Sequence, residues 1–252
     1  MTEALVSIGV AAALGPERIA RIAAAVEAAR FHALWVNDTP GADALAVLSA
    51  AAEVTDGLTL ATGVLPVDRR SAADIAAEVR DLPQERLVLG IGSGGARVGA
   101  LDLVGAGIAT LRSETTARVL VGALGPRMRA LAVEEADGPL LSWLTPDAAA
   151  EQAAEARAEG GYAALYVRTA LDDAASARLA EEAARYGSYP AYAANLARLG
   201  IAAEDTVLAP ATFADGIRRY REAVDEVVLR AIVPEDDESD YVRFIEQAAA
   251  LL

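Results

Sequence analysis

The sequence predicts an α/β protein whose eight parallel strands, each followed by a helix, close into a single (β/α)8 TIM barrel. Short apolar runs alternate with helical segments from one end of the chain to the other. Eight such alternations in 252 residues match the size of this barrel. No Ser- or Pro-rich linker interrupts them, so residues 1–252 are expected to form a single domain.

The strongest strand signal is residues 86–95, RLVLGIGSGG, an apolar run that leads into a Gly-Ser-Gly-Gly turn. A continuous apolar run bounded by turn residues is typical of a strand buried on both faces. Glycines at its end let other atoms approach the backbone closely, because no Cβ stands in the way. The segments predicted as strands are 5–10, 33–37, 58–64, 86–95, 118–121, 139–144, 163–168 and 226–232.

The helices follow from apolar spacing and from capping residues at their starts. Pro16 and Pro126 fit the first turns of two helices, and Asp43, Ser71 and Thr145 are N-cap residues of three others. The piece between the fourth and fifth strands is poorly patterned and predicts one short helix. The predicted helices are 16–30, 43–54, 71–82, 101–111, 126–136, 145–159, a mostly helical tract 172–220, and 239–251.

A competing interpretation rests on Gly90, Gly92 and Gly95, which satisfy the G-x-G-x-x-G dinucleotide fingerprint, with Glu114 about twenty residues on. It would make the chain an NAD(P)-dependent Rossmann dehydrogenase. The fingerprint sits on the fourth strand, however, and no strongly amphipathic helix follows it. The barrel is therefore favoured.

Composition excludes several kinds of partner and chemistry. A net charge of −15 and 5 % aromatic residues disfavour nucleic acid as a partner. With no Cys and one His, neither a metal site nor a Ser-His-Asp triad is expected. All 22 basic residues are Arg, which excludes Schiff-base chemistry. No apolar run is long enough to span a membrane, and residues 1–3 lack the basic start of a signal peptide, so a cytoplasmic protein without a membrane partner is expected.

Five stretches follow one another along nearly the whole chain: 31–38 (FHALWVND), 41–66, 86–95, 121–141 and 224–234. Together they resemble the luciferase-like monooxygenase superfamily of flavin- and deazaflavin-dependent oxidoreductases. The set is most similar to the branch that uses the deazaflavin coenzyme F420. The resemblance implies a barrel that binds F420, or FMN, and assembles as a homodimer. Family members usually carry a long insertion between strands four and five, where this chain has only residues 96–116, so it resembles a shortened member.

The ends of the strands give the candidate site, because active sites of such barrels lie at the C-terminal ends of the strands. Gly122–Arg127 combines free backbone N–H groups at a helix start with a guanidinium, and the family places cofactor phosphate near this loop. The alternative is an ordinary strand-to-helix turn. The full ring is Ala11, Asn37, Asp38, Thr62, Gly63, Gly92, Ser93, Gly94, Gly122, Ala123, Leu124, Gly125, Ser142, Trp143, Arg168 and Arg230.

Two further features of the ring depend on the resemblance. Thr62, Gly63 and Val64 match the place where the family has a non-proline cis peptide that bulges against the isoalloxazine ring; the alternative is a plain strand end. Asn37 and Asp38 match the family's polar pair after the second strand. Asp38 would accept a hydrogen bond or move a proton there, or it would cap the next helix.

The sequence therefore predicts an oxidoreductase that transfers hydride between F420 or FMN and a small organic substrate. Such chemistry is carried by the cofactor and asks for positioning more than for acid–base groups. Cofactor contacts are assigned to Thr62–Val64, Gly92–Gly94, Gly122–Gly125 and Arg127, and catalytic contacts to Asn37 and Asp38. The alternative is a non-catalytic shortened relative that binds a flavin or has lost the site.

Overall fold

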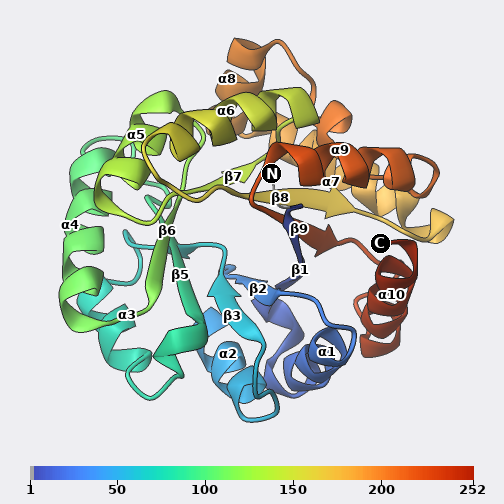
Figure 1. The fold of residues 1–252 in the computed structure, drawn as a ribbon, viewed down its shortest axis with the longest axis horizontal. Helices are drawn as coiled ribbons and strands as arrows, with labels where there is room; N and C mark the ends of the chain where they lie inside the picture. The colour runs from blue at the N-terminus through green and yellow to red at the C-terminus, as the bar shows by residue number, and fades with distance from the viewer. Residues whose placement is uncertain (1–2) are drawn as a thin grey trace.

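The computed structural model shows a closed barrel of parallel strands surrounded by helices, as the sequence predicts (Figure 1). It describes residues 3–252; Met1 and Thr2, part of the segment used to predict a cytoplasmic location, lie outside the described residues. The strand order is β3-β2-β1-β9-β8-β7-β6-β5-β4, and a pairing between β3 and β5 closes the ring. A Rossmann fold has an open sheet, so the NAD(P)-dehydrogenase interpretation is wrong.

The strands are β1 (Leu5–Ala11), β2 (Ala33–Asn37), β3 (Thr59–Thr62), β4 (Leu65–Pro66), β5 (Leu87–Gly92), β6 (Arg118–Gly122), β7 (Pro139–Ser142), β8 (Ala164–Thr169) and β9 (Glu226–Ala231). The helices are α1 (Pro16–Ala28), α2 (Ala44–Ala52), α3 (Ala72–Glu78), α4 (Ala100–Glu114), α5 (Pro126–Glu135), α6 (Pro146–Ala158), α7 (Ser176–Ser188), α8 (Pro190–Leu199), α9 (Phe213–Ala223) and α10 (Glu238–Leu251). In the part of the chain that is described, no helix is both long and apolar enough to cross a membrane.

Two regions differ from the predicted elements. The poorly patterned piece after the fourth predicted strand forms the 15-residue helix α4, in which Gly107 lies against Val67 and Ile91. Glycine weakens a helix locally but lets it pack closely, and here packing prevails. The tract 172–220 divides into α7, α8 and α9, and α8 begins at Pro190 because proline suits the first helical turn.

β3 and β4 are one barrel strand interrupted by a bulge. Ala61 pairs with Val88 and Leu65 pairs with Ile91, so residues 62–64 on one strand face only residues 89–90 on β5. One extra residue opposite a shorter segment is the definition of a β-bulge. The peptide between Gly63 and Val64 within it is cis, as the resemblance implies.

The glycines of β5 make room for this bulge. A Cβ at residue 90 would overlap the carbonyl oxygen of Thr62, whose hydroxyl donates to the Gly90 carbonyl at 3.0 Å. A Cβ at residue 92 would lie 2.8 Å from a methyl group of Val64, closer than real Cβ contacts. The close approach that the Gly-rich strand end predicts is therefore made first of all by the neighbouring strand of the same chain.

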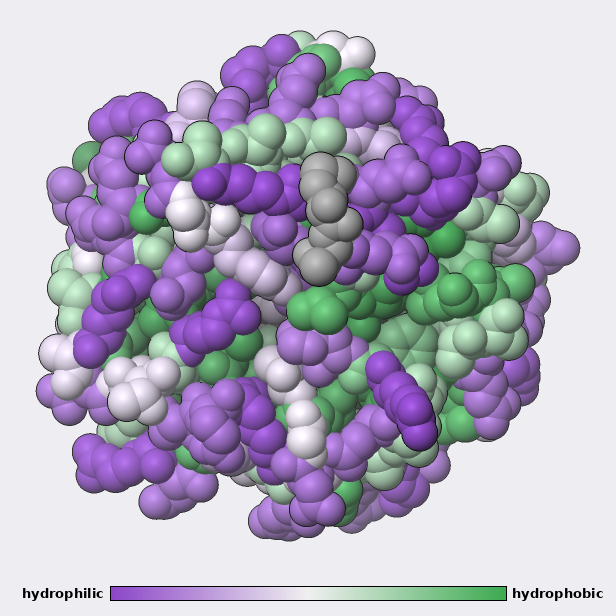
Figure 2. Space-filling view, viewed as in Figure 1, coloured by the Kyte–Doolittle hydropathy of each residue, from purple (hydrophilic) through white to green (hydrophobic). Residues whose placement is uncertain are grey.

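Two hydrophobic layers hold the barrel. The larger lies between the strands and the helices, and the smaller fills the inside of the barrel with residues that include Trp35, Leu120 and Tyr166. The rings of Trp35 and Tyr166 pack edge to face, with 5.8 Å between their centroids. On the face of the molecule shown in Figure 1, polar side chains cover most of the periphery, and hydrophobic side chains gather near the C-terminus (Figure 2).

A buried carboxylate lies inside the barrel at the N-terminal ends of its strands. Glu226, 2 % exposed, accepts hydrogen bonds from Ser7 Oγ at 2.5 Å, Trp35 Nε1 at 2.6 Å and Tyr162 Oη at 3.0 Å. Burial, and then the nearby Glu226 carboxylate, raise the pKa of Tyr162, which keeps its hydroxyl a donor. Three strands and the segment before β8 are thus joined at one carboxyl group.

Replacing this carboxylate should destabilise the fold strongly. We expect Glu226→Ala to lower the free energy of unfolding by about 3–5 kcal/mol, because three donors, two of them buried, lose their acceptor. Glu226→Gln keeps a carbonyl acceptor, so its loss should be about 1 kcal/mol. Urea unfolding measures both, with the exposed Glu151→Ala as control. Equal losses for Ala and Gln would show that the network is not what this residue contributes.

Candidate functional site

A cavity of about 470 Å³ opens at the C-terminal ends of the strands, within the range of small-molecule sites. The carboxyl ends of β2, β4, β5, β6, β7 and β8 surround it, together with the start of α8. It therefore lies where barrels of this kind place their active sites.

Strand alternation explains why this end of the barrel is hollow. Side chains two residues apart on a strand point to the same side, so the positions that follow the inner core also face inward. On β3, β5 and β6 these positions are all glycine, whereas β2 and β7 to β9 carry polar or cationic side chains. The last inward positions, in chain order, are Ala11, Asn37, Gly63, Gly92, Gly122, Ser142, Arg168 and Arg230.

Most of the residues predicted for the site come together around this cavity. Of the residues assigned cofactor or catalytic contacts, only Thr62 and Arg127 do not line it; of the rest of the predicted ring, Ser142 and Arg168 line it, whereas Ala11, Trp143 and Arg230 do not. Thr62 is fully buried and bonds β5 beneath the bulge, while Arg127 lies in the first turn of α5 with its side chain exposed. The residues that do line it are Asn37, Asp38, Gly63, Val64, Gly92, Ser93, Gly94, Gly122, Ala123, Leu124 and Gly125.

Asn37 and Asp38 sit differently within the lining. Asn37 Nδ2 donates to the carbonyl of Gly63 and so holds the bulge, whereas its Oδ1 is buried without a partner in residues 3–252. Both oxygens of Asp38 are engaged: one accepts the Ala44 amide at 3.2 Å, and the other pairs with Arg69 at 3.3 Å. Asp38 thus supports the start of α2 and fixes a guanidinium at the cavity.

The floor of the cavity carries a second unpartnered group, the hydroxyl of Tyr166. This side chain is 3 % exposed, and its oxygen has no hydrogen-bond partner in the described chain. It lies directly beneath Gly63, where a Cβ would collide with it. Burial raises its pKa well above the ordinary value, so the group stays a neutral donor. An unmet donor and an unmet acceptor, Asn37 Oδ1, are therefore buried in the wall of one cavity.

Arg168 supplies positive charge to the opposite wall. Its guanidinium stacks on Trp143 at 4.3 Å and on Tyr186 at 4.8 Å. It also donates to Ser142 Oγ at 2.6 Å and pairs with Glu182 at 3.3 Å. Stacking and pairing together fix the guanidinium plane, which a lysine at this position would not reproduce.

The sequence analysis did not predict the part of the cavity wall that α7 and α8 form. Tyr186 on α7, and Ala191 and Tyr192 on α8, line the cavity, and the two tyrosine rings pack edge to face with 5.0 Å between their centroids. They come from the tract that the sequence predicts only as mostly helical. The tyrosines of 186–192 were the available signal, because three in seven residues is dense for a chain with 5 % aromatics.

Fold and site together define a TIM barrel whose mouth holds a cavity lined by a bulged strand and bare glycine backbone. The family model of the luciferase-like monooxygenases matches residues 4–107. This confirms the resemblance to that superfamily predicted from the sequence. No curated protein sequence matches the chain.

Solved structures share the fold at low identity. An F420-dependent secondary alcohol dehydrogenase, in complex with an F420–acetone adduct, is 16 % identical with a TM-score of 0.75, covering 100 % of both chains. The coenzyme F420-dependent tetrahydromethanopterin reductase of Methanopyrus kandleri is 16 % identical with a TM-score of 0.69, covering 100 % of this chain and 99 % of that one. The FMN-bound oxygenating constituent of 3,6-diketocamphane monooxygenase from Pseudomonas putida is 13 % identical with a TM-score of 0.68, covering 96 % and 97 %.

The unpartnered hydroxyl makes a stability prediction with a matched control. Tyr166→Phe should leave the free energy of unfolding unchanged or raise it, because no hydrogen bond is lost. Tyr220→Phe removes the same atom from a hydroxyl close to two buried carbonyls, those of Leu144 at 2.8 Å and Thr206 at 3.1 Å. It should cost about 1–3 kcal/mol. Urea unfolding compares the two, and a similar cost for both would mean that Tyr166 is satisfied in solution.

Proposed function

We propose that the chain is a flavin- or deazaflavin-dependent oxidoreductase that transfers hydride between F420, or FMN, and a small organic substrate. The observation that carries this proposal is the cavity at the barrel mouth, with the 63–64 bulge and the glycines of β5 and β6 on one wall. A wall without side chains suits the face of a flat ring system, since nothing but backbone limits its approach. The structural neighbours named above bind F420 or FMN in the same fold.

The residues present fit such a ring. A flavin or deazaflavin carries both carbonyl acceptors and a ring N–H donor along one edge. Tyr166 Oη and Asn37 Oδ1 offer the complementary unmet donor and acceptor. When bound, the cofactor supplies the hydride chemistry, while the protein holds and orients it.

The surrounding residues have roles that follow from their contacts. Asn37 holds the bulge through the Gly63 carbonyl, and Arg168 would place positive charge near a bound ring, which gains electron density when it accepts hydride. Tyr186 and Tyr192 shield the cavity from water on the α8 side. Water exclusion strengthens each of these electrostatic contacts.

For the phosphate of the cofactor, we propose the loop Gly122–Gly125 at the start of α5. Gly125 is the N-cap residue, and no side chain caps this helix. First-turn N–H groups that lack a cap attract an anion, aided by the helix dipole. Because Arg127 does not line the cavity, the backbone and not this guanidinium is the expected anchor.

Parallel titration with F420 and FMN, followed by cofactor fluorescence, tests the proposal as a whole. Micromolar or tighter binding of one cofactor, with oxidation of its reduced form by ketones or aldehydes, is the expected result. Tight binding without turnover would support the non-catalytic relative instead. Absence of binding by both cofactors would retire the proposal.

Substitution of Gly125 tests the phosphate position. Gly125→Asp and Gly125→Asn both place a capping side chain on the N–H groups that phosphate would use, and both should keep or raise helix stability. We expect Asp to weaken FMN binding tenfold or more, Asn to weaken it less, and Ala to change it little. Riboflavin, which lacks the phosphate, should bind all four proteins alike. Unchanged FMN affinity in the Asp variant would place the phosphate elsewhere.

A further inference from the structure

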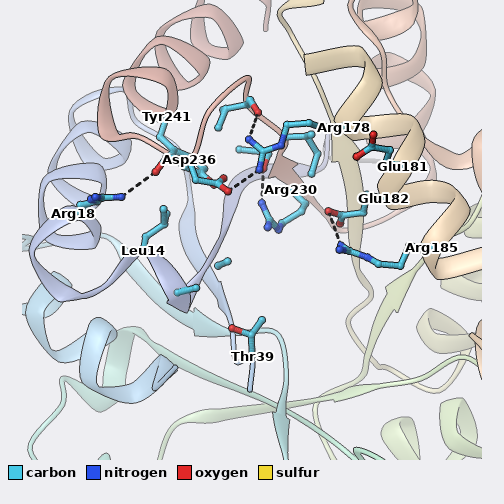
Figure 3. Close-up of a pocket in the computed structure, with 15 residues that line it drawn as sticks. Leu14, Arg18, Thr39, Arg178, Glu181, Glu182, Arg185, Arg230, Asp236 and Tyr241 are labelled. Carbon is cyan, nitrogen blue, oxygen red and sulfur yellow. Dashed lines mark hydrogen bonds and ion pairs between the residues drawn. The ribbon is translucent and has the colours of Figure 1, made fainter. Parts of the chain in front are cut away.

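A second cavity, of about 610 Å³, lies beside the first at the ends of β1 and β9 (Figure 3). The 3₁₀ turn after β1, the start of α1, helix α7 and the loop before α10 enclose it. Thr39 lines both cavities. Arg168 in the first and Arg230 in the second occupy paired positions on β8 and β9, so the two hollows adjoin.

Charged side chains dominate the lining of this second cavity, and most of them neutralise one another. Arg178 pairs with Asp236 at 2.6 Å, and Arg185 pairs with Glu182 at 3.4 Å. Glu182 also forms an ion pair with Arg168, which lines the first cavity. The charged residues of the lining are Arg18, Arg178, Glu181, Glu182, Arg185, Arg230 and Asp236.

Arg230 differs from the other cations. It donates to the carbonyl of Ala231 and lies against the Tyr241 hydroxyl, and no carboxylate in residues 3–252 lies within ion-pair distance of it. The side chain is half-buried and points into the middle of the cavity, between the Arg178–Asp236 pair and Glu182 (Figure 3). A partly desolvated guanidinium without a counter-ion favours binding of an anion.

We propose that this cavity binds the anionic group, carboxylate or phosphate, of the substrate, with Arg230 as its charged anchor. The proposal rests on the function proposed above and gives its substrate class: a small organic anion whose reacting carbon reaches the first cavity. Within the lining, Arg18, which donates to the Asp236 carbonyl at 3.0 Å, is the other arginine without a carboxylate partner among the described residues.

The overall charge makes this local excess informative. The chain carries −15, yet the lining has four arginines against three carboxylates, and Arg168 adds a fifth guanidinium at the boundary. In physiological salt, interactions between charges more than about 8 Å apart are largely screened. A ligand in the cavity therefore responds to these nearby cations more than to the distant acidic surface.

Calorimetric titration with succinate and with inorganic phosphate, at constant ionic strength and without cofactor, tests the proposal. The wild type should bind at least one of these anions, and Arg230→Met and Arg230→Gln should weaken it tenfold or more. Arg80→Met removes the same charge from an exposed site just beyond α3, and it should change nothing. The uncharged butane-1,4-diol should not bind.

Two further arms separate the sources of the anion and guard against misfolding. FMN and riboflavin are titrated into wild type and Arg230→Met. Unchanged FMN affinity supports a substrate site, whereas a loss of affinity for FMN alone assigns Arg230 to the cofactor phosphate and overturns the proposal.

The Arg18 side chain is exposed, so its replacement should not disturb folding. Arg18→Met should weaken the binding of succinate or phosphate two- to fivefold, even if the Arg230 variants do not fold. Equal anion affinity in all variants, or no anion binding, would also overturn the proposal. Because the anion arm uses no cofactor, its failure is distinct from a failure to bind flavin.

Discussion

The close approach of the bulged third barrel strand to its neighbour is the constraint on which the rest of the site depends. The Thr62 carbonyl and the Val64 side chain occupy space that a Cβ at residues 90 and 92 would need. The glycines on β5 thus serve the bulge, and the hydrogen bond from Thr62 to the Gly90 carbonyl fixes it from below. An interior so closely packed has no room for a compensating shift.

This constraint divides the barrel mouth into two unlike halves. The strands around the bulge end in bare backbone, whereas β8 and β9 carry Arg168 and Arg230 at their last inward positions. A face of bare backbone and a cationic edge would suit, respectively, the redox ring and the anionic reactant proposed above. The same alternation of inward positions creates both halves, because each strand contributes one residue to this last layer.

Periodicity and capping were sufficient to predict the barrel and nearly every element of it. The caps Asp43, Ser71 and Thr145 all hold in the structure. The ends of the strands also gave most of the cavity lining, since topology places them together. Which side chains face inward within that ring depends on register, so the outward position of Arg127 and the stacking of Arg168 were beyond reach. The tyrosine wall depends on how α7 and α8 fold back, which no local pattern specifies.

The exclusive use of arginine explains how an acidic protein keeps cations at its mouth. A guanidinium is less strongly hydrated than an ammonium group and keeps its charge when partly buried. Arg168 packs against two aromatic rings, and Arg178 donates to two backbone carbonyls besides its carboxylate. These contacts desolvate and orient the cations before any ligand arrives. Electrostatic contacts set in place in this way need little reorganisation when a ligand binds, and that is where their strength lies.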